Sequence, residues 1–585
     1  MKGKLKVIVI TLIVLLIGTG VFLWKMNDLS KSINAKEEAM LAEERDLIET
    51  QKSKVIDKVK SVDIIPLYLS GDKKNVVTTE FQSVAEVYDL QKSAQVEENL
   101  TTIKGNRSFL PEDPLWAYNP YGTNRNSMYL YFESHGKTYL RYTISVKDDK
   151  IPDFTRTAYN MTGDGATKEH ECQITGLVAG ETNFITLNLY NSDDKLSETR
   201  TFSVTIPESR IGASKHLEYD KGVSKRTISN GLYEVFSEGR KVGNSKKNAI
   251  LLYDNSGVLR GEIPTVDYIG RNLEQIYDTI AYASRQNQIV QVNSLGQVTA
   301  VHNLSGYKQA GEFIYDGYGN IYVIATANKK GATPRSKVLS VELETSRVKE
   351  AVNMDTLLKS VYQKAVKKSG KKNVDWVGID ALALAGTNKL LVSSQKLSSI
   401  FKISNVSSLM TRIDYIIADK RIYKSYSKSL QKKVLVKVEK EESEAEETEA
   451  PRKNILKKPV EKDTFISQYG QETLVCNSKV AKGNYSFSTL STGTQAGASP
   501  KEKSYYLTYK VKEEEKTYRL QGKQEVEKTT RDGSYTALEG QYIYCCSDRN
   551  YYTETDTTGR VLRTFHTTTR PYRVYKWDFK GFLFR

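Results

Sequence analysis

The side chains that most often perform chemistry are sparse in this sequence. The 585 residues include four cysteines and five histidines, and no two histidines have the spacing of a metal-ligand pair. The histidines are His135, His170, His216, His302 and His566. Phosphate-binding loops, dinucleotide fingerprints, nucleophile elbows and zinc spacings do not occur, and we therefore expect no cofactor and no metal. The neighbours Cys545 and Cys546 follow a strand-like stretch, so their side chains should point to opposite faces, which favours structural cysteines over a redox pair.

Composition and charge exclude several classes of protein. Charged residues make up 27% and hydrophobic residues 39% of the chain, which is not the composition of a mostly disordered or polytopic membrane protein. A net charge of +16 would attract an anionic ligand or surface. Lysine and arginine are scattered along the sequence, however, which predicts a mixed, solvated surface. We expect no nucleic-acid partner.

The start of the chain predicts the compartment. Three lysines precede the apolar stretch of residues 7–24, which as a helix would span about 27 Å, close to the thickness of a hydrocarbon core. A cleaved signal peptide is the rival interpretation, but no A-x-A site follows the stretch. We predict an uncleaved single-pass anchor over residues 1–25, localisation to the cell membrane, and an extracytoplasmic body. Residues 26–61, rich in Ala, Glu, Lys and Leu, are predicted to form a helical stalk.

Two β domains are expected after the stalk. Residues 62–209 contain short runs of alternating apolar and polar residues between turn clusters, the pattern of an antiparallel β-sandwich. Residues 210–585 repeat a unit of strand, tight turn with Asp or Asn and Gly, and strand, which predicts a β-propeller of about six blades. Arrays of barrels or sandwiches are the alternative. The expected fold class is therefore all-β, behind a transmembrane anchor and a stalk helix.

One segment interrupts the propeller pattern. Residues 431–462 include a run of glutamates followed by a basic stretch, and like charges resist packing. We predict a disordered surface insertion between blades. A calcium-binding loop is the sharper alternative, but the run lacks the spacing of Asp, Asn and Gly that such a loop requires.

Five segments of the predicted propeller resemble bacterial arylsulfate sulfotransferases. Residues 375–381 with 390–400 are similar to the family's D-W-[IV]-H-x-N-S and S-S-R-x-x-S-x-I segments. Residues 311–316 resemble its H-H-D-F segment, and residues 467–473 its Q-x-G-Q-H-T segment. Residues 572–582 look like the closing strand of the Gram-positive, membrane-anchored members. The resemblance covers nearly the whole chain, because it also takes in the anchor and the sandwich.

The resemblance implies sulfuryl transfer, a reaction that the composition alone does not indicate. Members of this family move a sulfuryl group from a phenolic sulfate ester to another phenol, without a nucleotide donor. A histidine in the central funnel of the propeller is the nucleophile. Further histidines and an arginine surround the sulfuryl and phenolic oxygens, because cations must offset the charge that develops there.

This sequence departs from the family pattern at every matched position. Glu472 replaces the nucleophilic histidine, and Gln395 replaces the arginine of the S-S-R segment. The remaining substituted funnel positions are Gly378, Asp380, Ala310 and Gly311. None of the five histidines falls on a matched position. His302 is the nearest in sequence to Ala310, and we expect it to end a strand facing solvent.

These substitutions oppose the family reaction. A carboxylate at ~4 Å repels an anionic ester by about 1 kcal/mol in water and about 4 kcal/mol at an effective dielectric of 20. We expect a divergent member that has lost the catalytic groups, and we assign no catalytic residue. Such a chain would act as a binding or scaffold protein, with a small phenolic or other ligand in the funnel or a protein partner in the envelope.

Two alternatives stay open at this point. In the first, Glu472 and Asp380 act as general acid and base in an active transferase or hydrolase with altered chemistry. In the second, the chain is an ordinary sulfotransferase whose catalytic residues lie elsewhere in the sequence. The simplest interpretation of the two carboxylates gives them no role and places them at strand ends facing solvent.

Overall fold

A computed structural model describes the chain from residue 54 onward. It covers residues 54–585 except 164, 238, 243–244, 439–466, 477–479, 494–502, 531 and 539. The predicted anchor, most of the predicted stalk and residues 439–462 of the predicted insertion lie outside the described residues. Within the described part, no helix is long and apolar enough to cross a membrane. The chain divides into two units, Met1–Lys60 and Ser61–Arg585.

The described residues of the first unit contain one short element. The 3-10 helix η1 covers Val55–Lys58, inside the range predicted for the stalk. The second unit begins with another 3-10 helix, η2, at Ser61–Asp63.

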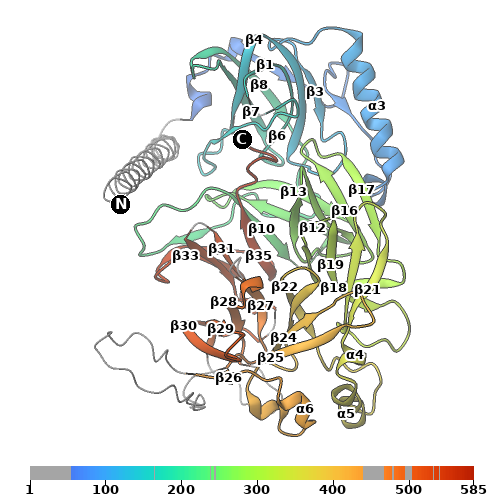
Figure 1. The fold of residues 1–585 in the computed structure, drawn as a ribbon. Helices are drawn as coiled ribbons and strands as arrows, with labels where there is room; N and C mark the ends of the chain where they lie inside the picture. The colour runs from blue at the N-terminus through green and yellow to red at the C-terminus, as the bar shows by residue number, and fades with distance from the viewer. Residues whose placement is uncertain are drawn as a thin grey trace, which may run out of the picture. The chain divides into compact units, whose positions relative to one another are not determined.

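The first domain of the second unit is the predicted β-sandwich (Figure 1). Its strands are β1 (Ile64–Leu67), β2 (Val77–Thr78), β3 (Leu115–Tyr118), β4 (Ser127–Ser145), β5 (Phe154–Thr157), β6 (Thr167–Thr175), β7 (Thr182–Tyr190) and β8 (Leu196–Thr205). The long strand β4 belongs to both layers, because its first half pairs with β3 and β6 and its second half with β5 and β7. A register shift between Glu133 and Thr138 marks the change of partner. The helices α2 (Val84–Val87) and α3 (Leu90–Asn106) complete the domain.

Six four-stranded blades follow, which confirms the predicted six-bladed propeller. Blade 1 contains β10 (Leu232–Ser237), β12 (Ser245–Tyr253), β13 (Leu259–Thr265) and the C-terminal β35 (Pro571–Trp577), with β11 (Arg240–Val242) paired to β12. Blade 2 contains β14 (Leu273–Ile276), β15 (Thr279–Arg285), β16 (Gln288–Asn293) and β17 (Val298–Asn303). Blade 3 contains β18 (Tyr307–Tyr315), β19 (Asn320–Ala327), β20 (Lys337–Glu342) and β21 (Val348–Asn353).

The second half of the ring has the same plan. Blade 4 contains β22 (Ile379–Leu384), β23 (Lys389–Ser394), β24 (Ser399–Ser404) and β25 (Arg412–Ile417). Blade 5 contains β27 (Glu472–Cys476), β28 (Asn484–Ser491), β29 (Lys503–Lys512) and β30 (Thr517–Glu527), joined by β26 (Val436–Lys437). Blade 6 contains β31 (Ser534–Leu538), β32 (Gln541–Cys545), β33 (Tyr551–Asp556) and β34 (Val561–His566), joined by β9 (Tyr219–Lys221). The helical connections are α4 (Met354–Leu357), α5 (Lys359–Ser369), η3 (Lys420–Tyr423), α6 (Lys428–Gln431) and η4 (Val480–Lys482).

The turn that repeats in the sequence has one geometry throughout. In the turn after β12, the Asp254 carboxylate accepts hydrogen bonds from the backbone N–H groups of Ser256 and Val258. The side chains of Asn293, Asp316 and Asp556 accept from the N–H groups two and four residues later in the same way. The short polar side chain thus satisfies the backbone of a tight turn, which is why Asp and Asn recur at these positions.

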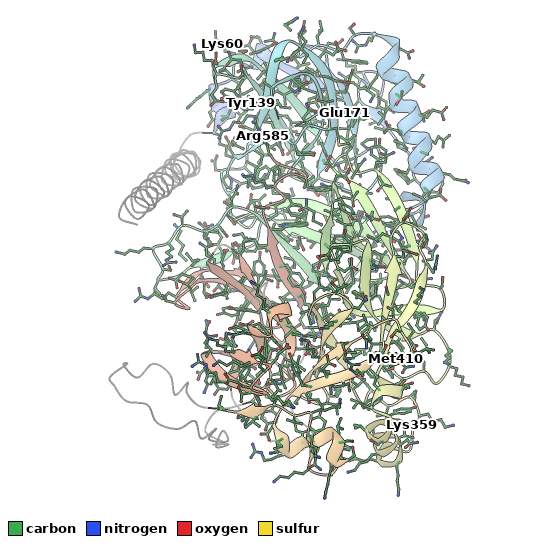
Figure 2. The ribbon with its side chains drawn as sticks, viewed as in Figure 1. Lys60, Tyr139, Glu171, Lys359, Met410 and Arg585 are labelled. Carbon is green, nitrogen blue, oxygen red and sulfur yellow. The ribbon has the colours of Figure 1, made fainter. Side chains whose placement is uncertain are left out.

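The two ends of the propeller chain close the ring together. The last strand, β35, pairs with β10, and the early strand β9 pairs with β34 of blade 6. A buried ion pair reinforces this closure, because Lys576 on β35 lies 2.9 Å from Glu554 on β33. Beyond β35 the chain returns to the sandwich, where Phe584 bridges Ala158 and the Arg585 N–H donates to the Thr157 carbonyl oxygen over 3.1 Å. Figure 2 shows Arg585 beside Tyr139 there.

Two predictions about individual residues can be compared with the fold. Cys545 and Cys546 contribute to different apolar clusters, so their side chains do point to opposite faces. The prediction that His302 faces solvent is wrong, since it is only 1% exposed. Its ring bonds to Ser346 of the next blade and to Gln291 of its own, so the neighbouring blade covers this strand.

Candidate functional site

Inner strands of the six blades surround the axis of the propeller. They are β14, β18, β22, β27, β31 and β35, and successive inner strands contact one another. Five of these inner strands each carry a charged residue in their first two thirds. These residues are Glu274 on β14, Glu312 on β18, Asp380 on β22, Glu472 on β27 and Arg573 on β35.

The side chain of Arg573 reaches across the axis. It is fully buried, at 0% exposure. One end of its guanidinium donates to the Glu312 carboxylate over 2.6 Å, and the other donates to the backbone carbonyl oxygen of Asp380 over 3.2 Å. The same end lies 3.7 Å from the carboxylate of Glu472. One arginine from blade 1 therefore contacts blades 3, 4 and 5, and it organises the centre of the ring.

Glu472, which the sequence resemblance aligns with the family's nucleophile, is held by several groups. Its carboxylate accepts a hydrogen bond from the Gln395 side-chain amide and one from the Asp532 backbone N–H over 3.2 Å. Burial raises the pKa of Glu472 to about 7, while Arg573 opposes the rise. This carboxyl group therefore keeps its proton to a higher pH than an exposed glutamate does.

Asp380 lies in the same buried cluster, but its carboxylate has fewer hydrogen-bond partners than that of Glu472. Burial and the neighbouring Glu472 raise its pKa well above the usual value. Ser393 lies near it, but neither carboxylate oxygen accepts a hydrogen bond of ordinary geometry. Glu274 continues the cluster into blade 2, with its pKa raised to about 8 by burial and by Glu312. Together these groups make the centre rich in carboxylates around one arginine.

A second arginine lies next to this cluster. Arg335 pairs with Asp375 and also donates to the Gln395 side-chain oxygen over 3.4 Å. Gly378 follows Asp375 closely in sequence, and its backbone has a positive φ of 52°. A Cβ at Gly378 would lie 2.8 Å from Lys396 Cγ and 3.1 Å from the Arg335 guanidinium. These two cationic side chains occupy the space that a histidine at Gly378 would need.

The structure brings together four of the six positions singled out in the sequence: Glu472, Asp380, Gln395 and Gly378. The expectation of solvent-facing carboxylates is wrong, because Glu472 is 2% and Asp380 3% exposed. Ala310 and Gly311 lie apart from the cluster. Ala310 packs against an apolar cluster, and a Cβ on Gly311 would meet Ile324 of β19 at 2.8 Å.

Sequence reasoning missed several charged members of the site: Glu274, Glu312, Arg335 and Arg573. Glu312 lies next to Gly311 and is the residue of β18 that reaches the centre, because successive side chains of a strand point to opposite faces and Gly311 faces Ile324 of β19. The available signal was position in the repeat. Glu274 and Arg573 lie near the start of an inner strand, where a charged residue is placed near the axis, whereas Glu312 lies near the middle of β18.

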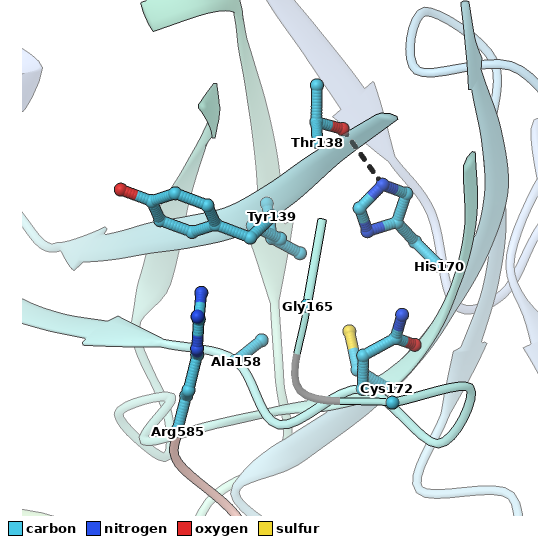
Figure 3. Close-up of a pocket in the computed structure, with 10 residues that line it drawn as sticks. Thr138, Tyr139, Ala158, Gly165, His170, Cys172 and Arg585 are labelled. Atoms are coloured by element: carbon cyan, nitrogen blue, oxygen red, sulfur yellow. Dashed lines mark hydrogen bonds between the residues drawn. The ribbon is translucent and has the colours of Figure 1, made fainter. Parts of the chain in front are cut away.

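A separate pocket lies in the sandwich (Figure 3). Its lining includes Thr138, His170, Cys172 and the C-terminal Arg585. The Thr138 hydroxyl bonds to the His170 ring over 3.0 Å, and burial lowers the pKa of His170 to about 4, so the ring is neutral at physiological pH. Burial also raises the pKa of the Cys172 thiol. This pocket offers no activated nucleophile, and we place the candidate site at the centre of the propeller.

Comparisons with known protein families agree with this architecture. The family described as Arylsulfotransferase (ASST) matches residues 219–562, more than half of the chain. The chain belongs to the arylsulfotransferase family. The family's Ig-like domain matches residues 115–207, which lie in the sandwich. A comparison with curated proteins found no match.

Solved structures resemble this arylsulfotransferase-family chain only distantly. A protein of unknown function from Bacteroides caccae has a TM-score of 0.35 and 9% identity, over 60% of this chain and 99% of its own. The periplasmic gluconolactonase of Pseudomonas aeruginosa has a TM-score of 0.32 and 8% identity, over 74% of this chain and 99% of its own. The WD40 domain of Toxoplasma gondii coronin has a TM-score of 0.31 and 10% identity, over 61% and 75%. Similarities this low carry no argument about function.

Proposed function

We propose that this arylsulfotransferase-family protein does not transfer sulfuryl groups by the family mechanism and acts instead as a binding or scaffold protein. The observation that carries the proposal is Glu472. A buried carboxylate, held by Gln395 and paired with Arg573, stands where the resemblance places the nucleophilic histidine. It is a weaker nucleophile than a histidine nitrogen, and its charge repels an anionic ester.

The charges around Glu472 support the same conclusion. The guanidinium of Arg573 is already engaged by the Glu312 carboxylate, by the Asp380 carbonyl oxygen and by Glu472. Arg335 is likewise paired with Asp375. A sulfate ester would have to displace these carboxylates from both arginines. Stabilisation of an anionic transition state requires donors that are free to point at the developing charge.

The proposed setting of the protein is the cell envelope. The lysine flank and apolar stretch of residues 1–25 would anchor it in the cell membrane, and the sandwich and propeller would lie outside the cytoplasm. There the propeller would present its faces to an envelope protein, or its centre to a small phenolic or other ligand.

Turnover of a chromogenic aryl sulfate with phenol as acceptor tests the proposal. We would compare the full-length chain in detergent with Glu472→His combined with Gln395→Arg, and with the isosteric control Glu472→Gln. We expect no turnover by the wild type or the control, and measurable turnover by the double variant. Gly378→His is left out because its side chain would collide with Lys396 and Arg335. Wild-type turnover that Glu472→Gln abolishes would overturn the proposal.

A second function has one specific observation in its favour. Glu472 and Asp380 interact electrostatically, and both pKa values are raised, so one carboxyl group can hold its proton while the other is ionised. General acid–base catalysis needs such a pair. Hydrolysis of neutral phenyl esters and glycosides would then follow a bell-shaped pH profile. The profile should lose one limb in Glu472→Gln and the other in Asp380→Asn, and unchanged profiles in both variants would exclude this function.

A further inference from the structure

Two lysine-rich segments of the propeller follow neighbouring blades. Residues 356–374, which include α5, contain six lysines and no acidic residue. Residues 420–437, which include η3, α6 and β26, contain six lysines, one arginine and no acidic residue. The first segment connects blade 3 to blade 4, and the second follows the last strand of blade 4. The two segments are far apart in the sequence, so the sequence alone does not predict that they are neighbours.

The fold places these segments side by side. The Lys364 ammonium group lies 4.9 Å over the ring of Tyr426, which joins α5 to the second segment. Val361, Tyr362 and Ile422 pack in one apolar cluster with Tyr426. Figure 1 shows α5 and α6 at the same end of the propeller, and Figure 2 shows Lys359 there. The exposed lysines of both segments therefore form one surface, which we call the lysine surface.

Of these exposed lysines, we take six to define the lysine surface: Lys359, Lys367, Lys368, Lys424, Lys428 and Lys432. None of the six forms an ion pair with an acidic side chain in the described part of the chain. Lys367 and Lys368 gain from their position in the last turn of α5, but that effect is small and confined to one turn. The expectation of a uniformly mixed surface therefore does not hold here, because folding concentrates one sign of charge. Such a surface repels itself and attracts anions.

We propose that the lysine surface binds a linear polyanion that carries repeated phosphate groups. The positive charge is spread over two exposed segments and is not gathered in a pocket, which suits an extended chain better than a small anion. Each phosphate that a lysine neutralises releases a condensed counterion, and this release drives binding in a salt-dependent way. The proposal goes beyond the proposed function, because the surface shares no residue with the centre of the propeller.

The apolar residues of the segments favour such a polymer over a membrane or a nucleic acid. Both segments are fully described, and neither exposes a large hydrophobic side chain. A peripheral membrane surface inserts apolar side chains between lipids, and single-stranded nucleic acids stack their bases on exposed aromatic rings. The Tyr362 and Tyr426 rings pack inward instead. The surface therefore offers ammonium groups and small polar side chains, with no exposed aromatic or aliphatic anchor.

Binding of fluorescent inorganic polyphosphate to the full-length protein, at several salt concentrations, tests the proposal. The test variant carries Lys367→Gln, Lys368→Gln, Lys424→Gln and Lys428→Gln. A control of equal net charge replaces four exposed lysines of the sandwich, Lys147, Lys150, Lys168 and Lys195, by glutamine. We expect at least tenfold weaker binding by the test variant and a change below twofold in the control. The slope of log K against log salt should fall by about 3, at roughly 0.7 per lost contact.

Three results would overturn the proposal. The first is no binding by the wild type at low salt. The second is equal weakening in the two variants, which would mean that net charge alone acts. The third is tighter binding to vesicles of anionic phospholipid or to oligo-thymidine of matched charge, which would assign the surface to a membrane or a nucleic acid. Vesicles are compared because Leu409 and Met410 are exposed in the loop after β24, and exposed apolar side chains can insert between lipids. Equal thermal unfolding midpoints would show that both variants fold.

Discussion

The guanidinium of Arg573 lies 3.7 Å from the carboxylate of Glu472, and the two side chains are 0% and 3% exposed. Blade 1 contributes the arginine and blade 5 the glutamate, so this contact spans the axis of the propeller. Each charge depends on the other, because an isolated ion at such burial is strongly disfavoured.

Replacing this arginine should destabilise the protein strongly. Arg573→Met leaves Glu312 and Glu472 buried without their counter-charge, and loss of one partner from a buried pair costs about 3–5 kcal/mol. We expect a fall of that size in the free energy of unfolding by urea. Adding Glu472→Gln to Arg573→Met should restore part of the loss. A fall below ~1 kcal/mol would show that solvent reaches the centre more freely than the structure indicates.

The raised pKa of Glu472 should make stability depend on pH. The unfolded chain releases the Glu472 proton near pH ~4.3, whereas the folded protein keeps it until the pH reaches its folded pKa of about 7. Between these two pH values the folded state binds more protons than the unfolded state. The free energy of unfolding therefore falls as the pH rises through this window. The slope approaches about 1.4 kcal/mol per pH unit for one proton. The buried histidines His170 and His302, whose pKa values are lowered, titrate in the opposite direction.

The difference between two proteins isolates the Glu472 contribution. We would measure urea unfolding of the wild type and of Glu472→Gln from pH 5 to pH 8. The wild type should lose stability relative to the variant as the pH rises, and level off above the pKa of Glu472. Parallel curves would contradict the raised pKa.

A methyl group at Gly378 should cost more than one at another glycine with the same backbone conformation. Gly378 has a φ of 52° and Gly370 a φ of 70°, so both substitutions by alanine are strained, by about 1 kcal/mol. At Gly378 the added Cβ would lie 2.8 Å from Lys396 Cγ, whereas nothing lies within 4 Å at Gly370. The loss in thermal midpoint should be larger for Gly378→Ala. Equal losses would mean that Lys396 moves aside without cost.

Removal of residues 579–585 should loosen one edge of the sandwich. The Tyr159 N–H donates to the Leu583 carbonyl oxygen over 3.2 Å, and the ring of Phe584 packs against Phe154 at 6.1 Å between centroids. The truncated protein should exchange the Tyr159 amide hydrogen at least tenfold faster, while the amide of Ile185 in β7 keeps its protection. Equal protection of Tyr159 in both proteins would show that the tail contributes nothing to this edge.

Part of the fold and of the site could be predicted because it depends on short stretches of the sequence. The turn residues Asp254, Asn293 and Asp556 use a short side chain to close a hairpin, and their recurrence predicted the propeller. Family-like segments likewise led to Glu472 and Asp380, which the structure brings together.

The remainder depends on geometry that no single segment contains. Glu312 of β18 reaches the centre while its neighbour Gly311 faces Ile324 of β19, because successive side chains of a strand point to opposite faces, and only the folded blade shows which face meets the axis. Arg573 contacts three distant blades, so its role exists only after the ring has closed. The lysine surface similarly arises from two segments that meet only in the folded chain.

Closure of the ring by β35 places a condition on the order in which the protein can fold. Blade 1 lacks its innermost strand until residues 571–577 have left the ribosome. Until then β10 presents an unpaired edge, and such edges are templates for pairing with other chains. The ring therefore closes only after residues 571–577 are available, and a chain truncated before them would have an open ring with an unpaired strand edge on β10.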